Sequence, residues 1–195
     1  MTPSRSPDVA RFEAVFEAHH RRVLAYVLRR LPTEADAEEA VAEVFAVAWR
    51  RIDLLPDTAT ALPWLLAIAR RVVANQNRGI ARRLRLGLRL FAEPRPAQAP
   101  DVETPALDAL ARLPGVDQEL LRLLAWDGLT QAEAGVVLGI SANAVAIRLY
   151  RARRRFAGEL TRIVAADAKG STDGRTSNKV EGRLPGRQRH EEHAP

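Results

Sequence analysis

The chain has 195 residues, and its 30 Lys and Arg against 24 Asp and Glu give a formal net charge of +6. This length allows one domain or two small ones. The positive charge favours a polyanionic partner, although the codon bias of a GC-rich genome would also enrich arginine. The absence of cysteine excludes a disulfide framework and a thiolate metal site. No apolar run approaches the roughly 20 residues of a membrane span, and the N-terminus lacks the apolar core of a signal peptide, so we expect a cytoplasmic protein with no membrane insertion.

The first half of the chain contains three segments in which apolar residues recur at helical spacing. Residues 1–9 have no such period and are expected to form a loose arm. The pattern then runs from Phe12 to Val27 and from Ala37 to Ile52, is interrupted by a loop at 53–62, and resumes where Pro63 opens a third helix. No segment shows convincing strand alternation, so the predicted class is all-α.

Charge and composition divide the chain into parts. From Arg70 to Ala92 there is no acidic residue, and an arginine run of this density indicates phosphate contact. Residues 92–105 are rich in proline and alanine, which predicts a flexible linker. Beyond Arg162 there are almost no large apolar residues, which predicts disorder. We therefore expect two small helical domains at 10–91 and 106–162, joined by the linker 92–105 and followed by a disordered tail at 163–195.

The stretch from Leu129 to Phe156 predicts a helix-turn-helix. Thr130 and Glu133 have the spacing of a capping box, which starts a helix. Gly139 ends that helix because glycine tolerates a left-handed backbone, and Ser141 caps the next. The second helix has a buried apolar stripe and a polar and basic outer face, which suits a recognition helix in a DNA major groove. An ordinary helical hairpin with a solvated arginine face is the alternative.

Three sequence blocks carry a family resemblance: AEEAVAEVFAVAWRR at 37–51, PWLLAIARRVVANQNR at 63–78, and LARLPGVDQELLRLLAWDGLTQAEAGVVLGISANAVAIRLYRARRRF at 110–156. Together they resemble the extracytoplasmic-function (ECF) group of bacterial sigma factors, in the sigma-70 family. The resemblance implies a non-enzymatic subunit, without cofactor or metal, that brings core RNA polymerase to promoter DNA and helps to open it. An anti-sigma factor is a further partner that it implies.

The resemblance assigns a role to each domain. The first would be region 2, which binds the polymerase clamp helices and melts the minus-10 element; the second would be region 4, which binds the minus-35 element and the polymerase flap. A free-standing helix-turn-helix regulator that acts without polymerase is the alternative. The helix after Pro63, its arginine run and the loop before it argue against such a regulator, because it needs no second DNA-facing domain.

The resemblance also implies residues for polymerase binding and strand opening. Glu39 and Glu43, one turn apart on the outer face of their helix, would meet the clamp, although plain solvation would also explain them. The loop 53–62 would capture an unstacked base, and the arginines after Trp64 would hold the strand backbone. The residues that would bind the minus-10 element are Asp57, Thr58, Trp64, Arg70, Arg71, Asn75, Arg78, Arg82 and Arg83.

The second of the two predicted DNA surfaces is the helix after Ser141. There Asn143 can pair with adenine, and Arg148 or Arg151 with guanine or a phosphate. The residues that would bind the minus-35 element are Ser141, Asn143, Ala144, Ile147, Arg148, Tyr150, Arg151 and Arg154. Positions that depart from the family pattern are Ala42, Arg71, Asn75, Ala144, Ala146 and Ile147.

No residue pattern indicates catalysis or metal binding. His19 and His20 are adjacent and point to different sides of a helix, so they cannot easily share a metal. We find no catalytic residues and no phosphate-cradling glycine loop. Trp49, Trp64 and Trp126 are expected to be core anchors rather than stacking platforms for bases.

Overall fold

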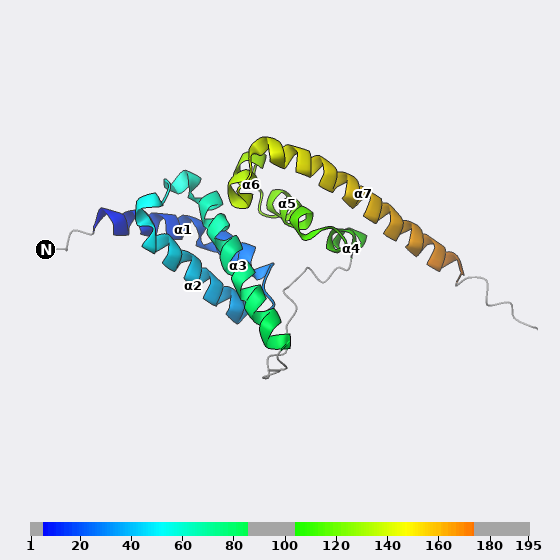
Figure 1. Cartoon of the computed structure of the whole chain (residues 1–195), viewed down its shortest axis with the longest axis horizontal. Coiled ribbons are helices and arrows are strands. Elements are labelled where there is room, and N and C mark those ends of the chain that lie inside the picture. Colours follow the sequence, from blue (N-terminus) through cyan, green and yellow to red (C-terminus); the bar gives the residue numbers. More distant parts are fainter. Residues whose placement is uncertain (1–5, 86–103, 174–195) are drawn as a thin grey trace, which may run out of the picture.

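The computed structural model describes residues 6–85 and 104–173, and the regular elements in these ranges are all helical (Figure 1). The prediction of an all-α protein is therefore confirmed. No single helix in these ranges is both long and apolar enough to cross a membrane. The elements are α1 (Pro7–Leu28), α2 (Glu34–Arg50), two short 3-10 turns η1 (Ile52–Leu54) and η2 (Thr58–Thr60), α3 (Ala61–Arg85), α4 (Pro105–Ala111), α5 (Gly115–Ala125), α6 (Gln131–Leu138) and α7 (Ala142–Asp173).

Two helices of the first half begin earlier than predicted, and each has a proline in its first turn. Helix α1 starts at Pro7, inside the expected loose arm, and α3 starts at Ala61, before Pro63. Proline is tolerated there because the first N–H groups of a helix have no intrahelical partner and the ring already fixes a helical φ. The first turn of α1 is largely exposed and lies outside the apolar period, whereas Ala61 and Leu62 of α3 are buried and precede the proline that was expected to open the helix.

The predicted helix-turn-helix is present as α6 and α7, which meet at 99°. The Thr130 hydroxyl accepts the Glu133 N–H at 3.2 Å, and the Glu133 carboxylate accepts the Thr130 N–H at 2.7 Å. Gly139 takes the left-handed conformation with φ 69° that the sequence predicted. The turn then passes so close to α6 that a Cβ built on Gly135 would lie 2.7 Å from the Ile140 carbonyl oxygen. Only glycine fits this close approach.

Helix α7 continues past Arg162 to Asp173, so the tail predicted to be disordered from residue 163 starts too early. Ile163 is buried, and α4 packs along α7. One buried isoleucine followed by the helix-forming Ala165 and Ala166 is enough to extend the helix, although few large apolar residues are present. The rest of that tail and the predicted linker from 92 to 103 lie outside the described residues.

The two helical halves share a continuous apolar core, which the sequence did not predict. Leu65 and Leu66 of α3 are fully buried, as are Leu120 and Leu123 of α5, and all four belong to one cluster of contacting side chains. Helix α3 packs directly against α6, and Figure 1 shows the two halves side by side. The connection is therefore tertiary and does not depend on the chain segment between α3 and α4.

The prediction that all three tryptophans anchor the core is wrong for two of them. Trp49 and Trp126 are 44% and 43% exposed, whereas Trp64 is half-buried. Trp49 is close to the end of α2 and makes an edge contact with Phe12, with ring centroids 5.2 Å apart. Trp126 caps the C-terminus of α5. Both lie at the rim of the core, where one side of a large ring is covered and the other stays in solvent.

Candidate nucleic-acid and polymerase interface

The first part of α7 presents its predicted base-contacting residues on an open face. Val145 and Leu149 are buried against the domain. Ile147 and Tyr150 are 48% and 64% exposed, and Asn143 is exposed as well. Arg151 and Arg154 are also exposed, while Ala144 and Arg148 are half-buried. This alternation leaves a face of α7 with amide, aromatic, aliphatic and guanidinium groups, the mixture that contacts base edges and phosphates.

Ser141 has a structural role at the start of this helix. Its hydroxyl oxygen accepts the Ala144 N–H at 3.2 Å. A hydroxyl used as an N-cap satisfies one of the free N–H groups of the first turn. Ser141 therefore fixes the entry of the recognition helix in addition to any contact it makes with DNA.

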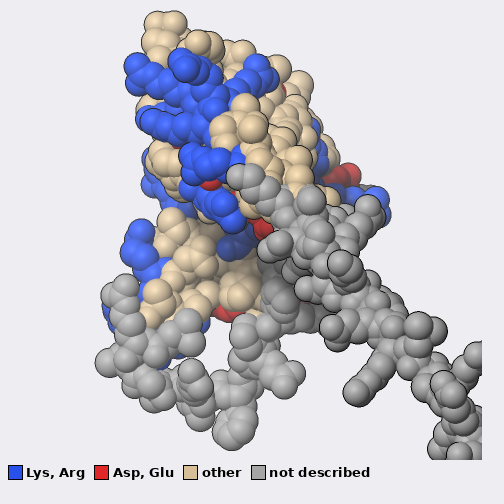
Figure 2. All heavy atoms as spheres, turned by 90° about the vertical axis from the view of Figure 1, so that its right-hand side faces the viewer, with Lys and Arg blue, Asp and Glu red and all other residues tan. Residues whose placement is uncertain are grey.

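Basic side chains gather over the upper part of the molecule, where Figure 1 shows the start of α7 (Figure 2). On α7, Arg151, Arg153 and Arg154 are exposed. Arg155 is tied to the body of the domain, because it donates to the buried carboxylate of Asp117. The free arginines of this surface can neutralise phosphates, and the tethered one orients α7 on α5.

The loop between α2 and α3 is held by one long-range hydrogen bond. The His19 Nε2–H of α1 donates to the Thr58 carbonyl oxygen at 2.7 Å. Within the loop, the Thr60 hydroxyl donates to the Asp57 carbonyl oxygen at 3.2 Å. Asp57 is exposed and Thr58 is half-buried. The loop is therefore accessible to solvent at Asp57 while its backbone is held against α1 at Thr58. No local pattern could have revealed this contact, because His19 and Thr58 lie 39 residues apart.

The predicted minus-10 residues of α3 differ in their surroundings. Arg71, Asn75 and Arg78 are exposed, and Arg78 donates to the Asn75 amide oxygen. Arg82 and Arg83 are exposed further along the helix. Trp64 is half-buried and packs on the core, so its ring supports the helix. Arg70 is exposed as well, and it lines a hollow at the boundary of the two halves together with Glu119 and Arg122 of α5.

The two glutamates predicted to face polymerase are both exposed on α2. The Glu43 carboxylate accepts from Arg50 at 2.9 Å, with side chains 50% and 61% exposed. An exposed pair of this kind contributes about 0–1 kcal/mol and is readily exchanged for another partner. Glu39 and Glu43 therefore remain available to basic groups of a docking surface.

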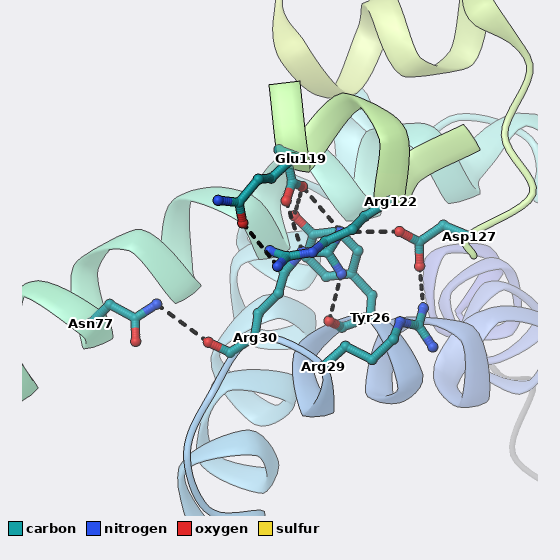
Figure 3. Close-up of polar contacts among 8 residues, drawn as sticks. Tyr26, Arg29, Arg30, Asn77, Glu119, Arg122 and Asp127 are labelled. Atoms are coloured by element: carbon teal, nitrogen blue, oxygen red, sulfur yellow. Dashed lines mark hydrogen bonds and ion pairs between the residues drawn. The ribbon is translucent and has the colours of Figure 1, made fainter. Parts of the chain in front are cut away.

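The sequence reasoning missed a buried set of charges between the two halves, which we call the interdomain ionic cluster: Arg29, Arg30, Glu119 and Asp127 (Figure 3). Arg29 caps the C-terminus of α1 and Arg30 follows it, Glu119 lies on α5, and Asp127 follows α5. The side chains of Arg30 and Asp127 are only 5% and 3% exposed, and that of Glu119 is 15% exposed. No local pattern could have revealed the cluster, because its partners lie about ninety or more residues apart.

Arg30 is the centre of this cluster. Its guanidinium donates to both oxygens of Glu119, at 3.0 and 3.2 Å, and to Asp127 at 3.1 Å. A further bond of 2.8 Å goes to the Tyr26 carbonyl oxygen, and the guanidinium carbon lies 3.5 Å from the centre of the Tyr26 ring. Arg29 donates to the other oxygen of Asp127. Two positive and two negative groups thus satisfy one another across the domain boundary.

The pKa values of Tyr26, Arg30 and Arg122, which lie at this boundary, are shifted from their ordinary values. Burial and the nearby Glu119 raise the pKa of Tyr26 far above its ordinary value, so its hydroxyl stays protonated and donates to Glu119 at 2.9 Å. Burial opposes the charge of Arg30, but the carboxylates of Glu119 and Asp127 favour it, and the pKa of Arg30 is raised. Arg122 lies nearby, and burial together with the charge of Arg30 lowers its pKa. These directions are the ones expected where burial removes water from closely spaced charged groups.

The class of protein follows from these surfaces. A helix-turn-helix with a basic outer face, joined to a second helical domain with an exposed arginine face, defines a two-domain DNA-binding transcription factor. Among residues 6–85 and 104–173, no group of three or more His, Asp or Glu side chains could hold a metal ion.

Comparison with known proteins identifies the family. Sigma-70 region 2 matches residues 15–83, and sigma-70 region 4 matches residues 105–156. The probable RNA polymerase sigma factor RfaY of Xanthomonas campestris is 30% identical over 171 residues, which cover 82% of this chain and 43% of that protein. The ECF RNA polymerase sigma factor SigL of Mycobacterium tuberculosis is 28% identical over 154 residues, covering 75% of this chain and 87% of that protein.

Among solved structures, the sigma factor RpoE in complex with the anti-sigma factor NepR from Bartonella quintana has the same fold, with a TM-score of 0.57 at 22% identity. The match covers 77% of this chain and 96% of that one. The chain belongs to the ECF group of the sigma-70 family, whose members are non-enzymatic factors that direct RNA polymerase to promoters. It spans less than half the length of RfaY but most of the length of SigL.

Proposed function

We propose that this chain binds core RNA polymerase through α2, opens the minus-10 element with the η1–η2 loop and α3, and recognises the minus-35 element with α7. The observation that carries the proposal is the pair of exposed basic faces, on α3 and on α7, in separate helical domains of one chain. One such face would suffice for a free-standing regulator. Two are needed by a factor that contacts a promoter at two places.

Strand opening is the proposed work of the first domain. Unstacking a base costs a few kcal/mol, and a protein site that receives the base offsets part of that cost. The loop carrying Asp57 and Thr58 is accessible and held in place by His19, so it can receive a base without first becoming ordered. Arg71, Arg78 and the neighbouring arginines of α3 would then hold the strand backbone, which gives affinity without sequence information.

Promoter recognition is the proposed work of α7. Asn143 has the amide that pairs with adenine in a major groove, and Ile147 has an exposed apolar group that suits a thymine methyl. Arg151 and Arg154 would bind guanine or phosphate. Because Ala144 and Ile147 cannot donate hydrogen bonds, we expect recognition by this helix to depend strongly on Asn143 and the arginines.

We further propose that the chain acts in the cytoplasm, catalyses no reaction itself, and is controlled by an anti-sigma factor. The RpoE structure, which has the same fold, contains such a partner. A protein of this kind would be expected to cover α2, α3 or α7, because these carry the surfaces on which activity depends.

Transcription in vitro with purified core polymerase tests the proposal. The chain should direct initiation from a subset of genomic fragments, whereas core polymerase alone should not. A free-standing regulator would bind some fragments without directing initiation, and that result would contradict the proposal.

A charge-reversal pair tests the docking surface separately. Glu39→Arg with Glu43→Arg should weaken binding to core polymerase at least tenfold in a titration, because both would then repel basic groups on the clamp. Asp8→Arg with Glu17→Arg makes the same charge change on exposed positions of α1 and should leave the affinity nearly unchanged. Equal affinities for the two variants would remove α2 glutamates from the interface.

A further inference from the structure

The hollow at the boundary of the two halves is lined by side chains from three helices. Helix α3 contributes the face that carries Arg70, Val73 and Asn77, which are spaced by three and four residues. The C-terminal end of α1 and two residues of α5, Glu119 and Arg122, form the rest of the lining. The hollow has a volume of about 340 Å³, which falls within the range of small-molecule sites, roughly 300–1,000 Å³. The fold therefore has room for a ligand of nucleotide size at this place.

The lining of the hollow carries an excess of positive charge from four arginines: Arg29, Arg30, Arg70 and Arg122. The carboxylates beside them are Glu119 and Asp127, both of which pair with Arg30. Within residues 6–85 and 104–173, neither Arg70 nor Arg122 has a carboxylate oxygen within 4.0 Å. Two positive charges therefore remain unpaired, and Arg70 and Arg122 carry them.

Two arginines of the lining have hydrogen-bond donors that no group accepts. The Nε–H groups of Arg29 and Arg122 are buried and have no partner in the part of the chain that the structure describes. Arg122 donates through another N–H to the Gln118 amide oxygen at 3.0 Å, and its guanidinium carbon lies 5.8 Å from the centre of the Trp126 ring. These contacts hold the side chain while part of its hydrogen-bonding capacity stays unused. Buried donors without acceptors are unfavourable, so an acceptor that reaches them would be bound favourably.

The electrostatic surroundings of Arg122 also favour an anion. Burial and the neighbouring charge of Arg30 lower the pKa of Arg122. The two guanidinium groups therefore repel each other where water screens them less than in bulk solvent. An anion bound between them would replace this repulsion with two attractive contacts. Phosphate suits such a site, because the planar guanidinium group can donate to two of its oxygens at once.

We propose that this hollow binds the diphosphate group of a small molecule of nucleotide size, with Arg70 and Arg122 as its main contacts. Two unpaired positive charges match a diphosphate, and the apolar Val73 of the lining can cover part of the remaining ligand. A nucleic-acid backbone fits less well, because a duplex presents its phosphates on a convex surface, whereas the Arg30 side chain of this hollow is only 5% exposed. The proposal does not depend on the function proposed above.

Calorimetric titration of the full chain tests the site. We expect pyrophosphate and ADP to bind with one site per chain at physiological salt, and adenosine, which lacks the phosphates, to show no binding. Arg122→Gln should weaken pyrophosphate binding about tenfold, because it removes a charged donor but keeps a polar side chain. Arg70→Gln should weaken it about threefold, because Arg70 is exposed and salt screens its contact more strongly.

The matched control is Arg71→Gln. Arg71 is the next residue of α3 and is also exposed, but it does not line the hollow. This variant loses the same charge and should keep the pyrophosphate affinity of the parent. An equal loss of affinity in Arg70→Gln and Arg71→Gln would show that pyrophosphate binds to basic surface in general, and the proposal would be overturned. Absence of pyrophosphate binding to the parent at millimolar concentration would overturn it as well.

A second titration distinguishes a small ligand from nucleic acid. Arg122→Gln should bind a DNA duplex with the affinity of the parent, measured by fluorescence anisotropy, while its affinity for pyrophosphate falls. An equal fall in the affinities for duplex and pyrophosphate would make the hollow a nucleic-acid contact and overturn the proposal. Circular dichroism checks that Arg122→Gln retains its helices, and the comparison of Arg70→Gln with Arg71→Gln stands even if it does not, because both positions are exposed.

Discussion

The two helical halves position their proposed DNA-binding residues in different ways. In the second half, local signals set the recognition helix: the Thr130–Glu133 capping box, the left-handed Gly139 and the Ser141 cap lie within a dozen residues. In the first half, the loop before α3 is set by a hydrogen bond from His19, 39 residues away in the sequence. The same class of function thus rests on short-range chemistry in one domain and on tertiary contact in the other.

Mutations in the two halves should therefore act in different ways. A change in the turn of the helix-turn-helix alters backbone geometry and should affect the folding of its domain. A change at His19 should leave the helices intact and affect only the loop, because the bond lies at the edge of the core. The expected effects therefore range from the folding of a domain to the adjustment of one segment.

The largest effect is expected at Gly135, where Ala would place a Cβ 2.7 Å from the Ile140 carbonyl oxygen. Gly135→Ala should lower the free energy of unfolding by about 3 kcal/mol, because the turn backbone must move away from α6. Gly158→Ala on the exposed face of α7 meets no atom within 4 Å and should instead raise stability by about 0.5–1 kcal/mol. Urea unfolding of both variants makes the comparison. Equal stability of the two would show that the turn is not as closely packed as described.

A smaller effect is expected on the specificity of α7. Asn143→Ala should reduce discrimination at one or two base pairs of the minus-35 element by about 2 kcal/mol, because the adenine edge loses its bidentate partner. Arg154→Ala should weaken binding to all sequences alike and flatten the salt dependence, with a log–log slope change of about 0.9. Binding selection from a randomised duplex provides the measurement. The same sequence preference in Asn143→Ala and the parent would reject this assignment.

A further prediction concerns His19→Ala, which removes the hydrogen bond that holds the loop of the first half. Losing a hydrogen bond worth about 1 kcal/mol should reduce open-complex formation on duplex promoters roughly fivefold, because the loop must be ordered at the time of base capture. The defect should nearly vanish on a template already mismatched at minus-10, since unpairing there needs no further work. Permanganate reactivity of the opened thymines measures open-complex formation on the duplex promoter and on the mismatched template. Arg21→Ala, exposed on α1 two residues away, is the control; an equal defect in it would assign the effect to α1 generally.

The smallest effect concerns the capping box and its pH dependence. Hydrogen bonds from the Thr130 N–H and hydroxyl lower the pKa of Glu133 below its ordinary value of 4.5. The stabilisation is therefore present above pH 4.5 and is lost as the pH falls through the lowered value. Glu133→Gln should cost about 0.5 kcal/mol at pH 7 and remove this part of the acid sensitivity. Thermal unfolding of the parent and of Glu133→Gln at pH 7 and pH 3 measures the difference in stability between them. An equal difference at both pH values would contradict the prediction.

Features that depend on neighbouring residues could be predicted from the sequence. Helical periodicity, the capping box and the glycine turn each involve groups within one or two helical turns, so the all-α class and the helix-turn-helix followed from spacing. Errors occurred where the local signal was absent: the starts of α1 and α3, the extension of α7 past Arg162, and the exposure of Trp49 and Trp126.

How the halves meet depends on contacts between residues far apart in the sequence. Arg30 and Glu119 are 89 residues apart, and neither differs in its local sequence from a solvated residue on a helix surface. Their pairing exists because α3 and α6 bury apolar surface against each other, which removes water from the nearby charges and makes each require the other. The same packing places Arg70 beside the second domain, although Arg70, Arg71 and Arg78 are all exposed. Which arginine of this acid-free stretch lies next to the second domain is therefore a property of the fold, because proximity is set by contacts that spacing along the chain does not encode.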